Sequence, residues 1–344
     1  MSASTAPVLD SVDEQRRQAE AVADRAARRA ALLDRTGVLV PFVVIFVLAA
    51  VLAPSFLSGA NIRSVLVNAS IVAVVGYGMT LAIVIRGLDL SVGSVAALTS
   101  CVGAAMINAV GIPVGAVGTL LLGLAFGLVN GILITFLRVP PFVATLATMG
   151  IARGAALLFT DGGRVQLEST GFRRLATGSV LGIPLPFVMA VVLCVLVYLL
   201  LERTPFGRHA SAVGGNPAAA REAGLSERRI GLIIYALSGA AAALAGLLLV
   251  AQLGTVDATP IQGLELQAIA VAVLGGTSML GGIGNLPGTF VASLLLAMIS
   301  SALNLRNVPG YYQYLALGLL LLLALLLDSL RTRIRTALAT GDPA

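Results

Sequence analysis

Long apolar stretches dominate the sequence and limit what the chain can fold into. They recur from residue 38 to residue 327, and short polar breaks separate them. A helix of about 20 apolar residues spans the hydrocarbon core of a bilayer. The 344-residue chain is 58% hydrophobic and 11% charged, which is too apolar for a water-soluble domain. We therefore expect an all-α polytopic membrane protein.

Ten segments satisfy or approach this length and are predicted to span the membrane. They cover residues 38–53, 64–85, 91–110, 114–137, 142–160, 186–201, 230–253, 264–274, 287–305 and 311–327. Ten spans place both ends of the chain on one side. Every basic residue is Arg, and arginines gather at cytosolic helix ends. Sixteen of them would lie inside and five outside, with Arg153 in a span, so we expect the N-terminus and the C-terminus in the cytosol.

Polar segments divide the chain into three expected regions. Residues 1–36 mix arginines with acids and are too acidic for the start of a cleavable signal, so we expect a retained cytosolic tail. Residues 37–335 form the expected transmembrane domain, which a cytosolic loop at 202–229 interrupts. Residues 336–344 form a second cytosolic tail.

The longest internal polar break, Arg203–Ser226, carries several local structure signals. Residues 214–216 predict a turn, and Asn216 predicts the N-cap of a short helix over 217–222. Gly224 is expected to end that helix. A short helix with a face of small residues suits docking into the groove of a partner; an ordinary solvated loop is the alternative.

Three glycines recur every fourth residue in the predicted span 114–137: Gly123, Gly127 and Gly131. Apolar burial does not drive helices together in lipid, and small residues on one face allow close packing. The helix that packs on them belongs either to the same chain or to a second subunit.

Two segments on either side of the polar break resemble each other. Gly87–Leu98 (GLDLSVGSVAAL) and Gly263–Leu274 (GLELQAIAVAVL) are identical at six of twelve positions, and Asp89 aligns with Glu265. By the predicted topology they enter the membrane from opposite sides. This is typical of an inverted repeat, here of spans two to five on spans seven to ten; chance similarity is the alternative.

Two further local features have alternative interpretations. Asp89 or Ser91 is expected to cap the following helix, and Asp89 is close enough in sequence to pair with Arg86; contact with a solute is the alternative. Residues 275–288 contain six glycines in fourteen residues. They form either a broken segment beside a pathway or a plain cytosolic connection.

Polar side chains within the spans are candidates for lining a conduit. Amides and hydroxyls suit a neutral hydroxylated solute, and the scarcity of intramembrane acids argues against a proton relay. Hydrogen bonds between helices are the alternative. The candidates within spans are Asn68, Tyr77, Thr80, Ser94, Asn108, Thr145, Thr148, Gln267 and Asn304, and Asp89, just before the span 91–110, is added to them.

The composition argues against catalysis by this chain. With His209 as its one histidine, the chain cannot assemble a histidine metal site or a Ser/His hydrolase. Without any lysine, it cannot form the phosphate-binding Walker A loop. We expect no catalytic, cofactor or metal site. The pI near 10.0 reflects arginines at cytosolic helix ends and indicates no nucleic-acid partner.

Four ordered motifs resemble the permease subunits of bacterial ATP-binding-cassette importers of the ribose, xylose and arabinose type. The likeness extends from about residue 40 to residue 330. The motifs are GLDLSVGS at Gly87–Ser94, PPFVATLATMGIARG at Pro140–Gly154, TPFGRHASAVGGNPAAAREAGLS at Thr204–Ser226 and AVLGGTSMLGGIGNLPGT at Ala272–Thr289.

This resemblance implies an alternating-access permease in the bacterial cytoplasmic membrane that imports a monosaccharide such as a pentose. The implied partners are two cytosolic ATP-binding subunits, an extracytoplasmic solute-binding protein and a second permease subunit, either a copy or a paralogue. Related importers of nucleosides or branched-chain amino acids, and an ion-coupled secondary transporter, are the alternatives. The resemblance implies that the loop couples transport to ATP hydrolysis through Gly207, Gly214, Gly215, Asn216, Ala219, Ala220, Gly224 and Leu225.

Overall fold

The computed structural model describes residues 38–258 and 263–340. The predicted tail at 1–36 and residues 341–344 lie outside the described residues. The helices are α2 (Leu39–Leu52), α3 (Gly59–Val84), α4 (Val92–Val110), α5 (Ile112–Thr135), α6 (Pro141–Thr160), α7 (Thr170–Thr177), α8 (Leu185–Arg203), α9 (Pro205–Gly215), α10 (Pro217–Glu222), α11 (Glu227–Leu253), α12 (Leu264–Leu274), α13 (Leu286–Leu305) and α14 (Gly310–Thr340).

All ten predicted spans are helical, and the chain is a polytopic all-α membrane protein. Within the described residues, seven helices are long and apolar enough to cross a bilayer; shorter apolar helices cover Leu39–Leu52, Leu264–Leu274 and Gly310–Leu326. Helix α3 begins five residues before the predicted start because Ser58 caps it, accepting a hydrogen bond from the Asn61 N–H at 3.3 Å. Helix α14 continues through the predicted end of its span to Thr340.

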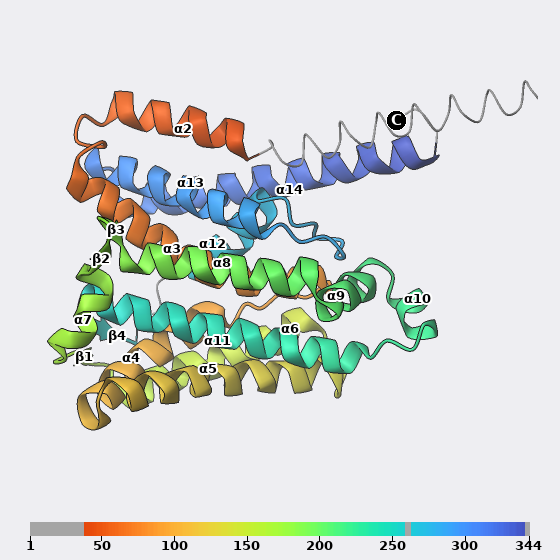
Figure 1. Ribbon diagram of the computed structural model, residues 1–344, viewed down its shortest axis with the longest axis horizontal. Coiled ribbons are helices and arrows are strands. Elements are labelled where there is room, and N and C mark those ends of the chain that lie inside the picture. Colours follow the sequence, from red (N-terminus) through yellow and green to blue (C-terminus); the bar gives the residue numbers. More distant parts are fainter. Residues whose placement is uncertain (1–37, 259–262, 341–344) are drawn as a thin grey trace, which may run out of the picture.

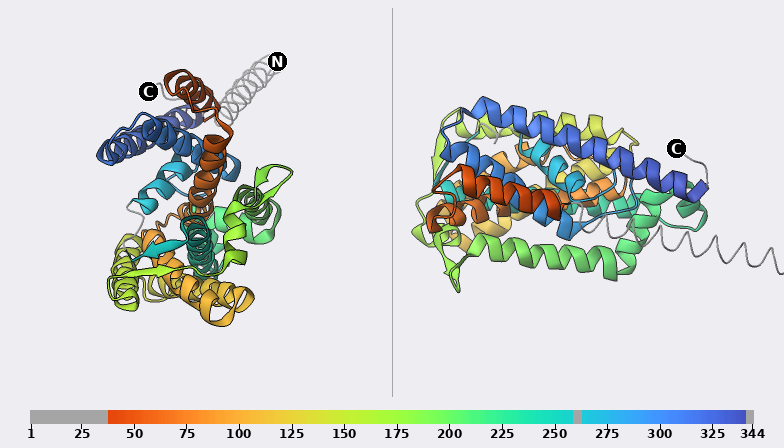
Figure 2. Two further views of the ribbon diagram at one scale, coloured as in Figure 1. Left: turned by 90° about the vertical axis from the view of Figure 1, so that its left-hand side faces the viewer. Right: turned by 90° about the horizontal axis from the view of Figure 1, so that it is seen from above.

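The helices run side by side along the long axis of the molecule (Figure 1). Helices α9 and α10 lie at one end, which we call the α9 end, and α7 with the short strands lies at the other, the α7 end (Figure 1). Helix α3 is central, with 94% of its apolar stretch buried; the corresponding share in α5, α6 and α8 is 28% or less. Figure 2 shows α3 between the other helices when the bundle is viewed along its axis. The exposed apolar faces of the peripheral helices suit contact with lipid.

The packing of the helices follows the same scheme in two halves of the chain. Helix α4 packs on α5 and α6, and α12 packs on α13 and α14. Likewise α11 packs on α4 and α5, and α3 packs on α12 and α13. Exchanging α3–α6 with α11–α14 preserves these contacts, as expected for the inverted repeat.

The twelve-residue alignment behind that expectation is wrong in detail. Residues 87–91 precede α4, which begins at Val92, whereas the aligned residues after Gly263 already belong to α12. The resemblance of the two segments therefore does not match equivalent backbone positions, and the repeat is supported by helix packing instead.

The glycine stripe packs α5 against α11 of the same chain. A Cβ on Gly127 would overlap the carbonyl oxygen of Tyr235, and a Cβ on Gly123 would overlap that of Gly239. A Cβ on Gly131 would lie 3.0 Å from the Leu232 Cα. The absence of side chains brings the two backbones together, so the partner of this stripe is α11 and not a second subunit.

The segment between α6 and α8 contains regular structure. It holds β1 (Arg164–Gln166), α7 and β2 (Ser179–Val180), and β2 pairs with β3 (Ile183–Pro184). Strand β1 pairs antiparallel with β4 (Thr255–Asp257), which follows α11. Hydrogen bonds from Arg63 to carbonyls at the end of α7, including that of Thr177 at 2.5 Å, tie this segment to α3.

Candidate functional site

Helices α9 and α10 form a compact pair whose boundaries follow from capping residues. Thr204 caps α9 by accepting from the Gly207 N–H (3.2 Å), and Asn216 caps α10 by accepting from the Ala219 N–H (3.1 Å). Gly224 follows α10 with a left-handed φ of 77°, a conformation that glycine adopts without strain. The predicted cap and stop are therefore present.

The turn expected at residues 214–216 is wrong, because Gly214 and Gly215 are the last residues of α9. Helix α9 continues through both glycines. Small residues are needed in this helix where it crosses the backbone of other segments. A Cβ on Gly214 would overlap the carbonyl oxygen of Val84. At the start of the helix, a Cβ on Gly207 would overlap the Leu201 carbonyl.

The residues of the expected coupling set divide into an inner and an outer group. Gly207, Gly214 and Ala220 are buried, and Leu225 is half-buried. The outer group of Gly215, Asn216, Ala219 and Gly224 is exposed. The inner group anchors the helix pair to the bundle, and the outer group gives the α9 end a surface of short side chains.

Arg86 connects the end of α3 to the end of α9. Its Nε donates to the Gly214 carbonyl at 2.5 Å and its Nη2 donates to the Gly215 carbonyl at 2.7 Å. The last carbonyls of a helix lack partners within the helix, so Arg86 satisfies two of them with positive charge at the favourable end. The expected pairing of Arg86 with Asp89 does not occur, because the two side chains bind different elements.

The glycine-rich linker between α12 and α13, residues 275–285, completes this contact. The Gly282 N–H donates to the Val84 carbonyl at 2.8 Å. Gly281 and Gly282 have left-handed φ values of 82° and 81°, which bring the linker backbone against α9. We call Val84, Arg86, Gly214, Gly215, Gly281 and Gly282 the Arg86 junction.

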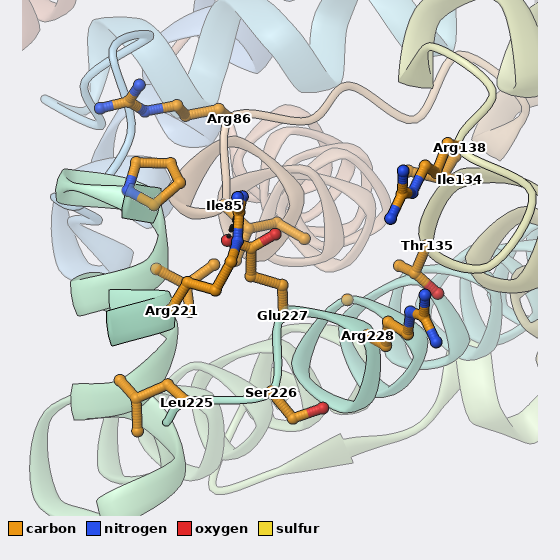
Figure 3. Close-up of a pocket in the computed structure, with 13 residues that line it drawn as sticks. Ile85, Arg86, Ile134, Thr135, Arg138, Arg221, Leu225, Ser226, Glu227 and Arg228 are labelled. Carbon is orange, nitrogen blue, oxygen red and sulfur yellow. Dashed lines mark hydrogen bonds and ion pairs between the residues drawn. The ribbon is translucent and has the colours of Figure 1, made fainter. Parts of the chain in front are cut away.

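A cavity of about 740 Å³ lies beside this junction (Figure 3). It is bounded by the ends of α3 and α5, by α10 and by the start of α11. Arg221 forms an ion pair with Glu227 at 3.1 Å, and Arg228 lies over the ring of Phe136 at 5.6 Å. The lining includes four arginines and one acid: Arg86, Arg138, Arg221, Arg228 and Glu227. The α9 end thus combines exposed small residues with a positively charged hollow, a surface suited to a partner protein with acidic side chains.

A buried polar network surrounds Asp89 in the linker between α3 and α4. Asp89 Oδ1 accepts from the Ser91 N–H and hydroxyl, at 3.1 and 2.5 Å, and Oδ2 accepts from the Ser238 hydroxyl at 2.7 Å. Asn130 donates to the Ser91 hydroxyl at 2.9 Å and accepts from Thr148 at 2.6 Å. Burial raises the pKa of the Asp89 carboxyl, against the lowering effect of the hydrogen bonds from Ser91 and Ser238. The network joins the linker before α4 to α5, α6 and α11.

The other pathway candidates lie at separate places in the described part of the chain. Tyr77 donates to the Ala190 carbonyl at 3.2 Å, and Thr80 pairs with Thr289 at 2.9 Å. Among the remaining candidates, Ser94 and Thr145 are buried, while Asn108 and Asn304 are exposed and hydrogen-bond to Gln166 and Gln313. Most candidates therefore make contacts between or within helices.

Asn68 and Gln267 do share an opening. Both line a cavity of about 190 Å³ with Ser300, and Asn68 accepts from Gln252 at 3.0 Å. Four polar side chains from α3, α11, α12 and α13 thus gather at one level of the bundle. Polar groups at such a position require water or a protein neighbour instead of lipid, so this cavity is the strongest pathway candidate in the described part of the chain.

The position of two polar residues beside the start of α4 was not predicted from the sequence. Ser238 binds Asp89 from α11. Glu265, at the start of α12, lies so close to Gly93 at the start of α4 that a Cβ on Gly93 would overlap its carboxylate. Serine in an apolar helix carries no distinctive pattern, and only the fold brings the starts of α4 and α12 together.

Comparisons with known proteins agree on one class. The family described as "Branched-chain amino acid transport system / permease component" matches residues 61–325. The ribose import permease protein of Bacillus subtilis is 39% identical over 303 residues, covering 86% of this chain and 93% of the relative. The L-arabinose ABC transporter permease protein of Azospirillum brasilense is 36% identical, covering 89% and 91%.

A third relative is named for a different substrate. The autoinducer 2 import system permease protein of Escherichia coli is 36% identical over 301 residues, which is 87% of each chain. No solved structure matches the chain at a significant level.

Proposed function

The chain belongs to the family of branched-chain amino acid transport system permease components, and from this we propose that it is the membrane-spanning subunit of an ATP-driven monosaccharide importer. The observation that carries the proposal is its similarity to the ribose and arabinose permeases over nearly their whole length. As a multi-pass protein of the bacterial inner membrane, it would accept the solute from an extracytoplasmic binding protein.

ATP hydrolysis has to come from partner subunits. The chain has no lysine for a Walker A loop, so in this proposal two cytosolic ATP-binding subunits bind the α9 end. A second permease subunit, a copy or a paralogue, completes the complex. Closure of the ATPase pair shifts the membrane domain only if the partners bind one arrangement of α9 and α10 better than the other.

Uncharged polar side chains at one cavity support the proposal of a neutral solute. The cavity shared by Asn68, Gln267 and Ser300 offers amides and a hydroxyl, which can exchange hydrogen bonds with sugar hydroxyls. The family is described by branched-chain amino acid transport, so these amino acids are the second candidate. Competition between labelled pentoses and leucine for the partner binding protein separates the two.

The docking surface can be tested with one bulky substitution. Ala219 is exposed on α10, so Ala219→Trp is expected to block binding of the ATP-binding subunits while the chain remains folded. Ala147 is exposed on α6, and Ala147→Trp serves as the matched control. The measurement is co-purification from membranes with ATPase activity; equal recovery of partners with both variants would contradict the assigned docking surface.

A further inference from the structure

Arg86 holds α9 in a fixed orientation relative to α3. A guanidinium is planar and rigid, and here two of its nitrogens bind the carbonyls of the neighbouring residues Gly214 and Gly215. Two hydrogen bonds from one planar group restrict both the rotation of the end of α9 and its distance from α3. Arg86 itself has a left-handed φ of 62°, which turns its side chain away from Asp89.

The linker between α12 and α13 is held by the same contact. A Cβ on Gly281 would lie 2.5 Å from the Arg86 Cγ and 2.8 Å from the Gly214 carbonyl oxygen. The linker therefore packs directly on the stem of Arg86 and on α9. Helix α3 belongs to the first half of the repeat, and the linker joins α12 and α13 of the second half, which both pack on α3. The junction therefore contacts both halves.

We propose that Arg86 is a positioning residue for transport that transmits displacement of the α9 and α10 pair to α3 and to the α12–α13 linker. The inference rests on the proposed function, because an ATP-driven partner has to supply the displacement. Without the two hydrogen bonds, α9 would move against the bundle and hydrolysis would no longer be converted into rearrangement of the membrane helices.

Arg138 provides a matched control in the same chain. It follows α5 at the α9 end, has a left-handed φ of 58° and is exposed. Within the described residues, Arg138 makes no hydrogen bond or ion pair, whereas Arg86 makes two bonds to α9. Substituting either residue removes the same charge from the same end of the molecule.

The first experiment compares variants in the reconstituted complex. Arg86→Gln is expected to retain ATP hydrolysis but to move less solute per ATP, by about fivefold or more, the lower end of typical coupling between sites. Arg86→Lys keeps the charge but cannot form the rigid two-carbonyl contact, so we expect an intermediate loss. Arg138 lines the partner-facing cavity, so Arg138→Gln is expected to change ATP hydrolysis and solute transport together and to keep the wild-type amount of solute moved per ATP. Wild-type solute per ATP in Arg86→Gln would overturn the proposal.

A distance measurement tests the junction without transport. Arg208→Cys and Leu280→Cys place spin labels on exposed positions of α9 and of the linker, and the native Cys101 and Cys194 are buried. A narrow distance distribution is expected in the otherwise wild-type and Arg138→Gln chains, and a broad one in Arg86→Gln. An unchanged distance distribution in Arg86→Gln would refute the proposal that Arg86 holds α9 in place.

The same labels follow the junction through the ATPase cycle. In the otherwise wild-type complex, the distance is expected to stay constant when the ATP-binding subunits are trapped with nucleotide; a changed distance would overturn the proposal even if the variants do not fold. A complex that moves no solute would instead count against the proposed function, and the distances would still decide whether Arg86 holds α9.

Discussion

Alanine at Gly214 is expected to abolish most solute uptake, whereas alanine at the neighbouring Gly215 is expected to leave uptake near the wild-type level. A Cβ at Gly214 would overlap the Val84 carbonyl oxygen and lie 2.7 Å from the Gly282 nitrogen. At Gly215 the nearest atom would be the Gly282 Cα at 4.0 Å. Overpacking of this kind costs about 1–3 kcal/mol, so α9 would have to move away from α3 and break the Arg86 contacts.

Each variant is the control for the other, because both replace a glycine at the end of α9 with alanine. The measurement is ATP-dependent uptake together with the yield of folded chain from size-exclusion chromatography. We expect both variants to be recovered folded and only Gly214→Ala to lose uptake. Equal uptake by the two variants would show that close contact between α9 and α3 is not needed for transport.

Removal of the Asp89 carboxylate is expected to cause a large loss of stability. Asp89→Ala would leave the hydroxyl of Ser238 and the N–H of Ser91 without their buried acceptor. Each buried donor left unpaired costs about 1–3 kcal/mol. We therefore expect a lower thermal unfolding temperature in detergent and a reduced yield.

Two further variants separate lost hydrogen bonds from lost charge. Asp89→Asn retains one acceptor oxygen and nearly the same volume, so its loss of stability is expected to lie between those of wild type and Asp89→Ala. Glu168 is exposed, and Glu168→Ala is expected to unfold like wild type. If Asp89→Ala unfolds at the wild-type temperature, the network is not a major source of stability.

The membrane helices could be predicted from sequence because hydrocarbon thickness imposes a length and a composition on each of them. Even α12 was placed correctly, since Gly263 and Gly275 bound its apolar run. Local signals also worked for α10, where the Asn216 cap and the Gly224 stop depend on neighbouring residues alone. The structure between α6 and α8 could not be predicted, because its strands are very short and β1 pairs with the distant β4.

The Arg86 junction could not be predicted, because its residues are far apart in the sequence. Arg86 and Gly214 are 128 residues apart, and no local pattern indicates which helix end an arginine will bind. Sequence proximity favoured a pair with Asp89, which the turn at Arg86 prevents. Gly214 was assigned to a turn because two adjacent glycines usually mark one; their actual requirement is space for the backbone of α3.

The pathway was only partly predictable, because an amide or hydroxyl in a membrane helix can bind either a neighbouring helix or a solute. Thr148 and Thr80 turned out to bind neighbouring helices. Only their place at one shared cavity singles out Asn68 and Gln267, and this does not follow from the residue types.

Uptake of labelled ribose, xylose and arabinose into proteoliposomes tests most directly whether this chain is the membrane subunit of an ATP-driven sugar importer. The vesicles would contain this chain with its candidate ATP-binding subunits, the solute-binding protein would be added outside, and ionophores would collapse all ion gradients. If the chain is the membrane subunit of an ATP-driven importer, we expect accumulation of a sugar that requires internal ATP and that stops when the ATP-binding subunits are omitted. Uptake that needs no ATP and disappears with the ion gradient would contradict it and would identify an ion-coupled transporter.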